Sequence, residues 1–501
     1  MSELLIGWAE ESLVPDKKVN VYGQFYERIS DHVETEITAT ALAISKGDQS
    51  AIIVSCDLTA VRQFLLDEVR KIFAEICPEV PVQNLIIGAT HTHTSVGYAS
   101  KQTGGDSFGT AASVLNEFLP PERQYTPLVT ADDSIMKDTD ALDFLAVRIA
   151  KAAKRAWDNR AEGGFTNAFG RAVVGFCRRV CYNDGSAQMW GDTNTATFTQ
   201  LEGGNDSGIE LLYVYNKEKK LTGVVANIAC PSQILEHRSF ISADYWGEVK
   251  VNLRKELGDD LFLLPMCGAG GDQCPRDLVR WVQPETPIND PNIKRPDVID
   301  RVADPSMFDL SGCRRVGKRI SNEILAVLEE LGQPQTDAVF EHQVITLDLP
   351  LRKATISQYD EAVRELEYYV AKNKDKEVFN YEDKAKMHVY AGTIVRYREQ
   401  QYIETKPVEV HIIRLGDIAI ATNPFELFLD YGNRMKARAR AKQTFIMQLT
   451  GGSMGYLPTE KAEQGGHYSA YISSGQFGHE GGDLLTRKTI TTINKMFGKG
   501  E

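Results

Sequence analysis

The sequence predicts an α/β protein in which mixed β-sheets are layered with helices and a metal site lies at the C-terminal ends of the strands. Three observations support this fold class. Short β-branched, apolar segments end abruptly in turn residues, segments of helical period lie between them, and polar clusters follow several of them directly. With 501 residues, 42% of them hydrophobic and 25% charged, the chain can bury a large core. We expect one catalytic domain over 1–501, with surface insertions at about 275–309 and 372–387.

Eight short apolar segments are predicted to be strands, because each is four to nine residues long and is bounded by turn residues. They are 50–55, 84–88, 211–215, 223–229, 261–266, 408–415, 418–422 and 444–449. The turn at Leu415-Gly416-Asp417 predicts a hairpin, so the sheet is expected to be mixed. The sequence shows no internal repeat and no Gly/Ser linker.

Two segments between these strands are predicted to be helices. Residues 59–76 carry an apolar stripe at helical spacing, and 357–371 begin with Ser357 and Asp360 in capping positions. The segment 275–309 is rich in Pro, Asp and Asn, which predicts a surface excursion. The charged segment 372–387 predicts a solvated helix pair or its connection.

The composition excludes several classes of partner. A net charge of −13 argues against nucleic-acid binding and against broad adsorption to anionic membranes. No apolar segment reaches the length of a membrane span, so no stable membrane insertion is expected. The first residues show no signal-peptide pattern and the eight cysteines are scattered, which favours a cytoplasmic protein with reduced thiols and a small-molecule substrate.

The most informative motif is His91-Thr92-His93, directly after the predicted strand 84–88. Two histidines two residues apart on an extended segment point to the same face, so both imidazoles can approach one metal ion or one substrate. The alternative interpretation is a pair of polar residues that cap a strand. The motif alone favours the two interpretations about equally.

Two further clusters follow predicted strands. Glu426 comes directly after 418–422 and beside Pro424, a position that suits a metal ligand. The glycine-rich segment 267–275 lets the backbone approach a ligand and form an anion-binding nest, although it lacks the ending of a P-loop. Its Cys274 is a candidate nucleophile, against the commoner reading of an inert buried thiol.

These clusters share one kind of position, since each leaves the end of a predicted strand. They are 88–94, 230–245, 267–275, 423–426 and 451–459. Ligand sites of open α/β sheets gather beyond the carboxyl ends of the strands. Their joint placement therefore predicts one site.

The same segments resemble the catalytic domain of the neutral/alkaline non-lysosomal ceramidases. The matching motifs are His91-Thr92-His93, Ile241-Ser242-Ala243-Asp244-Tyr245, Gly271-Asp272-Gln273-Cys274-Pro275, Pro424-Phe425-Glu426 and Gly455-Tyr456-Leu457-Pro458-Thr459. The match runs in the same order from about residue 6 to about residue 482. The resemblance implies a zinc ion and an activated water that attacks an amide carbonyl. It also implies His91, Glu426 and Tyr456 as zinc ligands, with His93 orienting or stabilising the reacting group.

The chain departs from the family pattern at two positions. Cys230 stands where the family has its second zinc histidine, and we expect His237 to act as the fourth ligand. Cys274 stands where the family has a serine. The family is secreted or membrane-associated and carries a further C-terminal domain, so a soluble, polar substrate is expected in place of a lipid.

The remaining candidate residues follow from these expectations. Arg179, Gln24 and His467 are predicted to bind a polar substrate, such as one with an acidic group, since the arginine fork suits carboxylates. Asp272 is expected to act beside His93 and Cys274 in catalysis. Asp244 is a candidate hydrogen-bond acceptor for a ligating histidine.

We therefore predict a metal-dependent hydrolase with one Zn²⁺, or another divalent ion, per chain. Its water would attack an amide or related bond. Two alternatives stay open. The site could catalyse β-elimination on a uronic-acid saccharide, with Tyr456 and His93 as acid and base, or the chain could bind a ligand without turnover.

Overall fold

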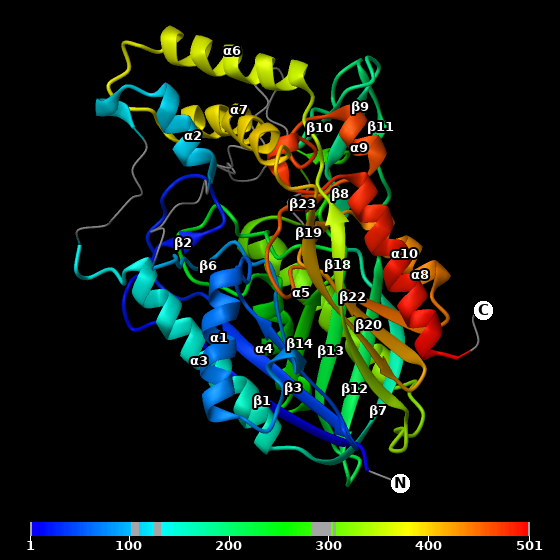
Figure 1. The fold of residues 1–501 in the computed structure, drawn as a ribbon. Helices are drawn as coiled ribbons and strands as arrows, with labels where there is room; N and C mark the ends of the chain where they lie inside the picture. Colours follow the sequence, from blue (N-terminus) through cyan, green and yellow to red (C-terminus); the bar gives the residue numbers. More distant parts are fainter. Residues whose placement is uncertain (1–2, 102–109, 125–131, 283–301, 304–306, 499–501) are drawn as a thin grey trace.

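Two β-sheets pack face to face, and helices cover the outer face of each (Figure 1). The computed structural model describes residues 3–101, 110–124, 132–282, 302–303 and 307–498. Apolar side chains of both sheets, among them Trp8, Ile53 and Leu264 on one and Ile420 and Phe445 on the other, form the core between them. The predicted mixed α/β class is confirmed.

The larger sheet has eight strands in the order β14-β13-β12-β7-β1-β3-β4-β5. The strands are β1 (Leu5–Ser12), β3 (Thr38–Lys46), β4 (Gln49–Cys56), β5 (Leu85–Ala89), β7 (Ala161–Arg171), β12 (Gly208–Asn216), β13 (Leu221–Ile228) and β14 (Phe262–Cys267). The outermost pairs, β4–β5 and β13–β14, are parallel, and the other pairs are antiparallel. At the centre, β1 meets β7 over two register pairs, Leu5↔Glu162 and Ile6↔Ala161. The sheet therefore consists of two four-stranded halves joined by a short seam.

The smaller sheet has the order β18-β19-β20-β22. Its strands are β18 (Phe340–Pro350), β19 (Thr405–Leu415), β20 (Ile418–Thr422) and β22 (Gln443–Met447). The first three are antiparallel in sequence order, and β20 and β22 are parallel. Each half of the larger sheet has this same arrangement, so the fold contains three four-stranded units of one topology. The repetition lies in strand order and direction, which is why the residues themselves show no repeat.

Each unit carries its helices on the outer side (Figure 1). The helices are α1 (Gln63–Ile76), α3 (Asp138–Asp158), α4 (Tyr245–Leu257), α5 (Asp309–Leu328), α8 (Leu429–Arg438) and α10 (His479–Met496). Helices α1 and α3 pack on the β1–β5 half, α4 and α5 on the β12–β14 region, and α8 and α10 on the smaller sheet. In every unit one helix connects the third strand to its parallel neighbour, as a parallel pair requires.

A third group of helices lies beyond the strand ends. It comprises α2 (Thr110–Phe118), α6 (Ile356–Lys372) and α7 (Tyr381–Glu399), which share an apolar core of their own. Arg396 of α7 donates to the backbone carbonyls of Gly475 and Gln476. This group is thereby tied to the segment that includes the turn η5 (Ile472–Ser474) and the short helix α9 (Glu460–Gly465).

The predicted elements agree with the structure, with differences at their ends. All eight predicted strands and both predicted helices are present, and the 415–417 turn joins β19 to β20. Helix α1 begins at Gln63 and not at residue 59, because Thr59 bonds to Thr92 and Ser95 of another loop. The capping box of α6 is Thr355 with Gln358, two residues earlier than the predicted pair Ser357 and Asp360.

The two predicted insertions differ in what can be described. Residues 372–387 connect α6 to α7 and form the start of α7, as predicted for a helix pair. Of 275–309, the residues 283–301 and 304–306 lie outside the described part of the chain. The short strands β16 (Trp281–Val282) and β17 (Val302–Ala303) pair with each other.

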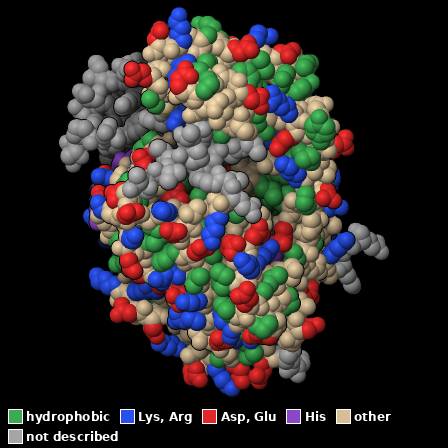
Figure 2. Space-filling model, turned by 60° about the vertical axis from the view of Figure 1, so that its left-hand side comes forward, with side chains coloured by type: hydrophobic (Ala, Val, Ile, Leu, Met, Phe, Trp, Pro, Cys, Tyr) green, Lys and Arg blue, Asp and Glu red, His purple; other side chains and the backbone are tan. Residues whose placement is uncertain are grey.

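The surface and the thiols match the composition. Acidic and basic side chains are interspersed over the face shown in Figure 2. All eight cysteines are free, and seven are buried. Among the described residues, no helix is long and apolar enough to cross a membrane.

Polar side chains hold the outer edge of β22 against the larger sheet. Asn227 of β13 is almost fully buried, and its amide Nδ2 donates to the carbonyls of Ile446 (2.8 Å) and Met266 (3.2 Å). Its Oδ1 accepts the backbone N–H of Ile446 at 3.3 Å. Asn227 therefore pairs with Ile446 as a neighbouring strand would.

We predict that Asn227→Leu lowers the free energy of unfolding by about 2–4 kcal/mol, because it leaves buried backbone groups of Ile446 without partners. Urea unfolding at neutral pH measures this loss. The control is Asn433→Leu at an exposed position of α8, which should change stability by at most about 0.5 kcal/mol. An equal effect of the two substitutions would contradict the role given to Asn227.

Candidate functional site

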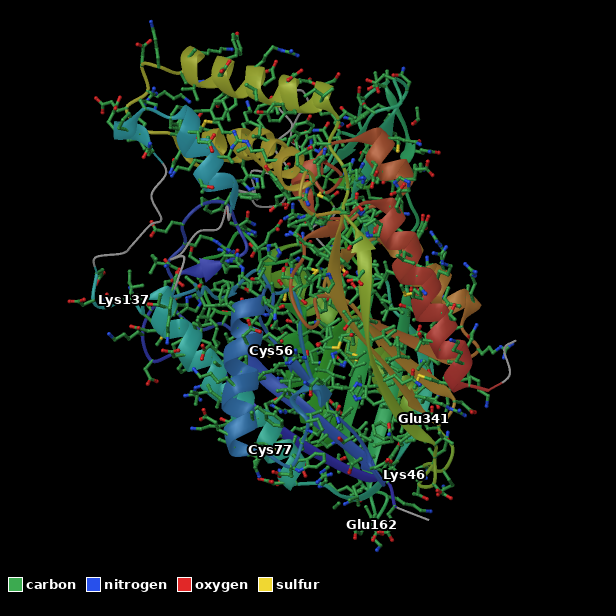
Figure 3. The ribbon with its side chains drawn as sticks, in the orientation of Figure 1. Lys46, Cys56, Cys77, Lys137, Glu162 and Glu341 are labelled. Atoms are coloured by element: carbon green, nitrogen blue, oxygen red, sulfur yellow. The ribbon has the colours of Figure 1, made fainter. Side chains whose placement is uncertain are left out.

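The polar clusters gather at one end of the two sheets. Lys46, Glu162 and Glu341 lie at the opposite end of the sheets (Figure 3). Strand β4 starts at that opposite end and runs to Cys56, towards the clusters. The segments that follow β4, β5, β13, β14, β20 and β22 all continue from the end at which the clusters lie. The predicted common location of the clusters is thus explained by the three parallel strand pairs.

His91 is held by its backbone and by one ring nitrogen. It follows β5 in a left-handed conformation (φ 63°), which is rare for a residue with a side chain. Its Nδ1 lies 2.5 Å from the backbone carbonyl of Thr59. A carbonyl only accepts, so Nδ1 carries a hydrogen, and Nε2 is left to bind a proton or another cation.

Glu426 faces Nε2 of His91. Its short strand β21 (Glu426–Leu427) pairs in parallel with β23 (Tyr456–Leu457), which sets Glu426 directly beside Tyr456. Glu426 Oε2 lies 3.4 Å from His91 Nε2. Burial disfavours the carboxylate, but a protonated His91, the charge of Arg178 and hydrogen bonds from His91 and Tyr456 outweigh burial and hold the pKa of Glu426 below its usual value. The side chain is 16% exposed, so the carboxylate can be reached.

His93 comes close to the same point by a different route from the predicted one. The segment after Ala89 is not a strand, so the alternation of an extended chain does not explain the pair. The two rings stand at 89° to each other, with Nε2 to Nε2 at 3.4 Å. The ring of His93 lies against Gly23, where a Cβ would sit 2.7 Å from its Cγ. Burial and the charges of His91 and Arg178 lower the pKa of His93 well below its usual value.

Arg178 brings a buried positive charge to these groups. It is 3% exposed, and its guanidinium donates to the carbonyl of Gly271 (3.0 Å), the hydroxyl of Tyr456 (3.3 Å) and the side-chain oxygen of Gln233 (3.4 Å). All three acceptors are neutral oxygens. Burial works against its charge, but nearby Tyr456 and Glu426 raise the pKa of Arg178. The guanidinium can therefore bind an anionic group that enters the site.

The donor set fits a metal ion in part. Among the described residues, no three His, Cys, Asp or Glu side chains are grouped so as to hold one. His91 Nε2 nevertheless faces a carboxylate oxygen 3.4 Å away, an arrangement that favours a cation, either a proton or a metal ion, between them. Two tetrahedral ligands at about 2.0–2.1 Å from zinc lie about 3.3 Å apart. With the phenol oxygen of Tyr456 as third ligand, the residues present suit a catalytic site with an open fourth position.

His237, expected as the fourth ligand, is placed elsewhere. Its Nε2 lies 3.9 Å from Asp309 Oδ1 at the start of α5. Cys230 is also turned away, because its thiol lies near the carbonyls of Val174 and Pro231 in the core against α4 and α5. The structure thus brings together His91, His93, Glu426 and Tyr456, but not His237.

The other predicted catalytic residues have structural partners. Asp272 accepts the backbone N–H of Leu429 at 2.9 Å, and burial raises its pKa to about 6. The thiol of Cys274 donates to the carbonyl of Arg276, and burial raises its pKa to about 12. At neutral pH this thiol is protonated, which does not favour a nucleophile. Asp244 is the N-cap of α4, accepts the N–H groups of Tyr245 and Leu235, and makes no contact of its own with a histidine of the site.

The residues predicted to bind substrate also hold the protein together. Arg179 is fully buried, pairs with Glu202, and donates to carbonyls of the 462–468 segment. Gln24 donates to the carbonyl of Glu236, and His467 Nδ1 accepts the N–H of Met189. These contacts order the loops that they join, and none of them excludes a ligand at Gln24 or His467.

The sequence reasoning missed three residues. Neighbouring arginines in an extended segment face opposite sides, so the selection of Arg179 left out Arg178, which faces Tyr456. Glu236 Oε2 lies 3.7 Å from His93 Nδ1, and Arg276 pairs with Glu236 at 2.8 Å. Glu236 lies in the cluster 230–245, and Arg276 directly follows the cluster 267–275. Glu236 and Arg276 pair across a long stretch of sequence, and no local pattern of residues predicts such a pair.

The fold is similar to that of solved ceramidases. Neutral ceramidase from Pseudomonas aeruginosa matches with a TM-score of 0.67 and 12% identity, over 99% of this chain and 75% of that chain. A ceramidase complexed with C2 matches with a TM-score of 0.65 and 11% identity, over 99% and 76%. No family model and no curated protein matches the chain. The resemblance noted in the sequence is confirmed as a neutral-ceramidase-like fold.

We predict that Asp244 makes stability depend on pH. Burial raises its pKa to about 7, whereas an aspartate in an unfolded chain titrates near pH 4. The ionised form is thus disfavoured in the folded state. The contribution of Asp244 to stability is greatest below about pH 4 and is lost as pH rises towards 7, by on the order of 4 kcal/mol.

Urea unfolding between pH 4 and pH 8 tests this, with Asp244→Asn as the variant. The wild type should lose stability relative to Asp244→Asn across that range and run parallel to it above pH 7. Asp184→Asn serves as control, since the hydrogen bonds of Ser186 lower the pKa of that exposed carboxylate and its effect falls below pH 4. A constant difference between wild type and Asp244→Asn would contradict the prediction.

Proposed function

We propose that this chain is a metal-dependent hydrolase that cleaves an amide bond of a small, polar substrate. The observation that carries the proposal is the approach of His91 Nε2 to Glu426 Oε2 at 3.4 Å, beside Tyr456 and His93. His91, Glu426 and Tyr456 would hold the ion. When bound, a divalent cation polarises the carbonyl and lowers the pKa of water at its open position.

The residues of the chain have separate tasks in this reaction. His93 Nε2 lies next to the proposed ligands, is neutral at pH 7, and would accept a proton from the attacking water and return it to the leaving nitrogen. Arg178 would stabilise the negative charge that develops on the carbonyl oxygen, or a carboxylate of the substrate. The water adds to the carbonyl carbon, the C–N bond breaks, and an acid and an amine leave.

The metal ligands are tested by elemental analysis of purified wild type and three variants. We expect about one zinc per chain in the wild type, and little in His91→Ala and Glu426→Gln. His237→Ala is the matched control and should keep its zinc, because His237 lies against Asp309. A wild type that stays free of metal after zinc is supplied and excess removed would overturn the metallohydrolase proposal, and loss in His237→Ala alone would overturn this ligand set.

The reaction is tested with a panel of short N-acyl amides that carry neutral or anionic head groups. Release of a primary amine is followed by chromatography. Absorbance in the ultraviolet is recorded with uronic-acid saccharides, since an unsaturated product would identify a lyase. Hydrolysis of an amide that stops in His91→Ala supports the proposal, and elimination without hydrolysis contradicts it.

We predict opposite outcomes for the two neighbouring arginines. Arg178→Gln should lower kcat/KM by about 10²–10³, because it removes a positive charge at the developing oxyanion, with a small change in Tm. Arg179→Gln should lower Tm clearly, because Arg179 joins Glu202 to the 462–468 segment. Kinetics and thermal unfolding of both variants provide the comparison. Unchanged kcat/KM in Arg178→Gln would remove Arg178 from the proposed reaction.

A further inference from the structure

Glu236 and Arg276 form a buried ion pair behind His93. Glu236 is 4% exposed and Arg276 is 1% exposed, with Oε1 and Nη2 at 2.8 Å. The other carboxylate oxygen, Oε2, lies 3.7 Å from His93 Nδ1. The pair thus presents one oxygen to a cation and the other to the imidazole.

Both partners of this pair are held in place. The guanidinium of Arg276 lies 4.6 Å from the ring centroid of Trp190 and 4.2 Å from that of Phe308. The backbone carbonyl of Glu236 accepts hydrogen bonds from Arg28 (2.7 Å) and Gln24 (3.1 Å). The carboxylate therefore keeps a fixed direction towards His93.

His93 is equally confined. Its backbone N–H donates to Ser232, its carbonyl accepts from Arg28, and its ring lies against Gly23. The ring has Nδ1 on the side of Glu236 and Nε2 on the side of His91. A carboxylate beside one nitrogen favours the hydrogen on that nitrogen, and leaves the other nitrogen with its lone pair.

We propose that Glu236, fixed by Arg276, is a positioning residue that holds His93 as the Nδ1–H tautomer with its Nε2 lone pair directed at the reacting groups. This role rests on the proposed hydrolysis, in which Nε2 takes the proton of the attacking water. Glu236 stays paired with Arg276 and touches neither water nor substrate. It orients the imidazole and stabilises the imidazolium, as a third group does for a catalytic base.

The tautomer is tested without any substrate. Protein labelled with ¹⁵N-histidine is compared by NMR with Glu236→Gln, and the His93 signals are assigned by their loss in His93→Gln. Glutamine keeps the size of the side chain, but its amide can present an N–H towards Nδ1, which favours the Nε2–H tautomer. We expect Nδ1–H in the wild type and a switch in Glu236→Gln. An unchanged tautomer overturns the proposal.

Kinetics provide a second readout with a matched control. Glu236→Gln should lower kcat by about 10²–10⁴ with KM changed by less than about threefold. Glu210→Gln also removes a buried carboxylate paired with a cation, Lys436, but at the edge of β22. It should leave kcat and the His93 tautomer unchanged. Equal losses of kcat in both variants would show a general effect of a lost ion pair and overturn the role of Glu236.

The two proposals fail separately. If the wild type hydrolyses no amide while the tautomer switches in Glu236→Gln, the hydrolase proposal fails and the positioning of His93 stands. If amides are hydrolysed but the tautomer does not switch, Glu236 is not the positioning residue and the hydrolase proposal stands.

Discussion

The edge of β22 is the contact on which the arrangement of the two sheets depends. A strand edge carries backbone groups that need partners, and here the buried side chain of Asn227 supplies them for Ile446 in place of a further strand. Asn227 pairs with Ile446, and Gln443 bonds to the carbonyl of Ala168 and to Glu210. Gln448 accepts the N–H groups of Gly270 and Leu427. Apolar contacts alone would let the sheets slide, whereas these directional bonds set one register between them.

That register places the chemistry. Gln448 joins the loop after β14 to the strand that contains Glu426. It does so beside the end of β5, where the N–H of Ala89 donates to the carbonyl of Leu449. His91, Glu236 and Glu426 come from three different units of the fold. The distance between His91 and Glu426 is therefore a consequence of how the sheets meet, and not of either loop alone.

Much of the fold could be predicted because it is encoded locally. An apolar segment such as 418–422 is bounded by turn residues, and the stripe of 59–76 repeats at helical spacing, so both elements follow from neighbouring residues. The exact start of α1 could not be predicted from neighbouring residues, because Thr59 bonds to a loop more than thirty residues away. The three units of one topology could not be predicted from the sequence for the same reason, since they are alike in the pairing and direction of their strands and not in their residues.

The candidate site divides in the same way. His91 and Glu426 were identifiable because each follows a strand and carries ligand chemistry, and the structure brings them together. Glu236 and Arg276 were not, since their pairing spans forty residues and depends on the path of two loops. His237 was selected for its nearness in sequence to the expected position, but the turn before α4 directs it towards Asp309.

The division of the site among three units has a consequence for how the molecule is made. A partly synthesised or partly folded chain that contains the first two units has His91 and Glu236 but lacks Glu426, so it has only part of the proposed ligand set. The proposed ligand set is therefore complete only when the smaller sheet is docked on the other two units. Because the short seam between β1 and β7 joins the units of His91 and Glu236, the alignment of these two units also sets where the smaller sheet can complete the proposed ligand set.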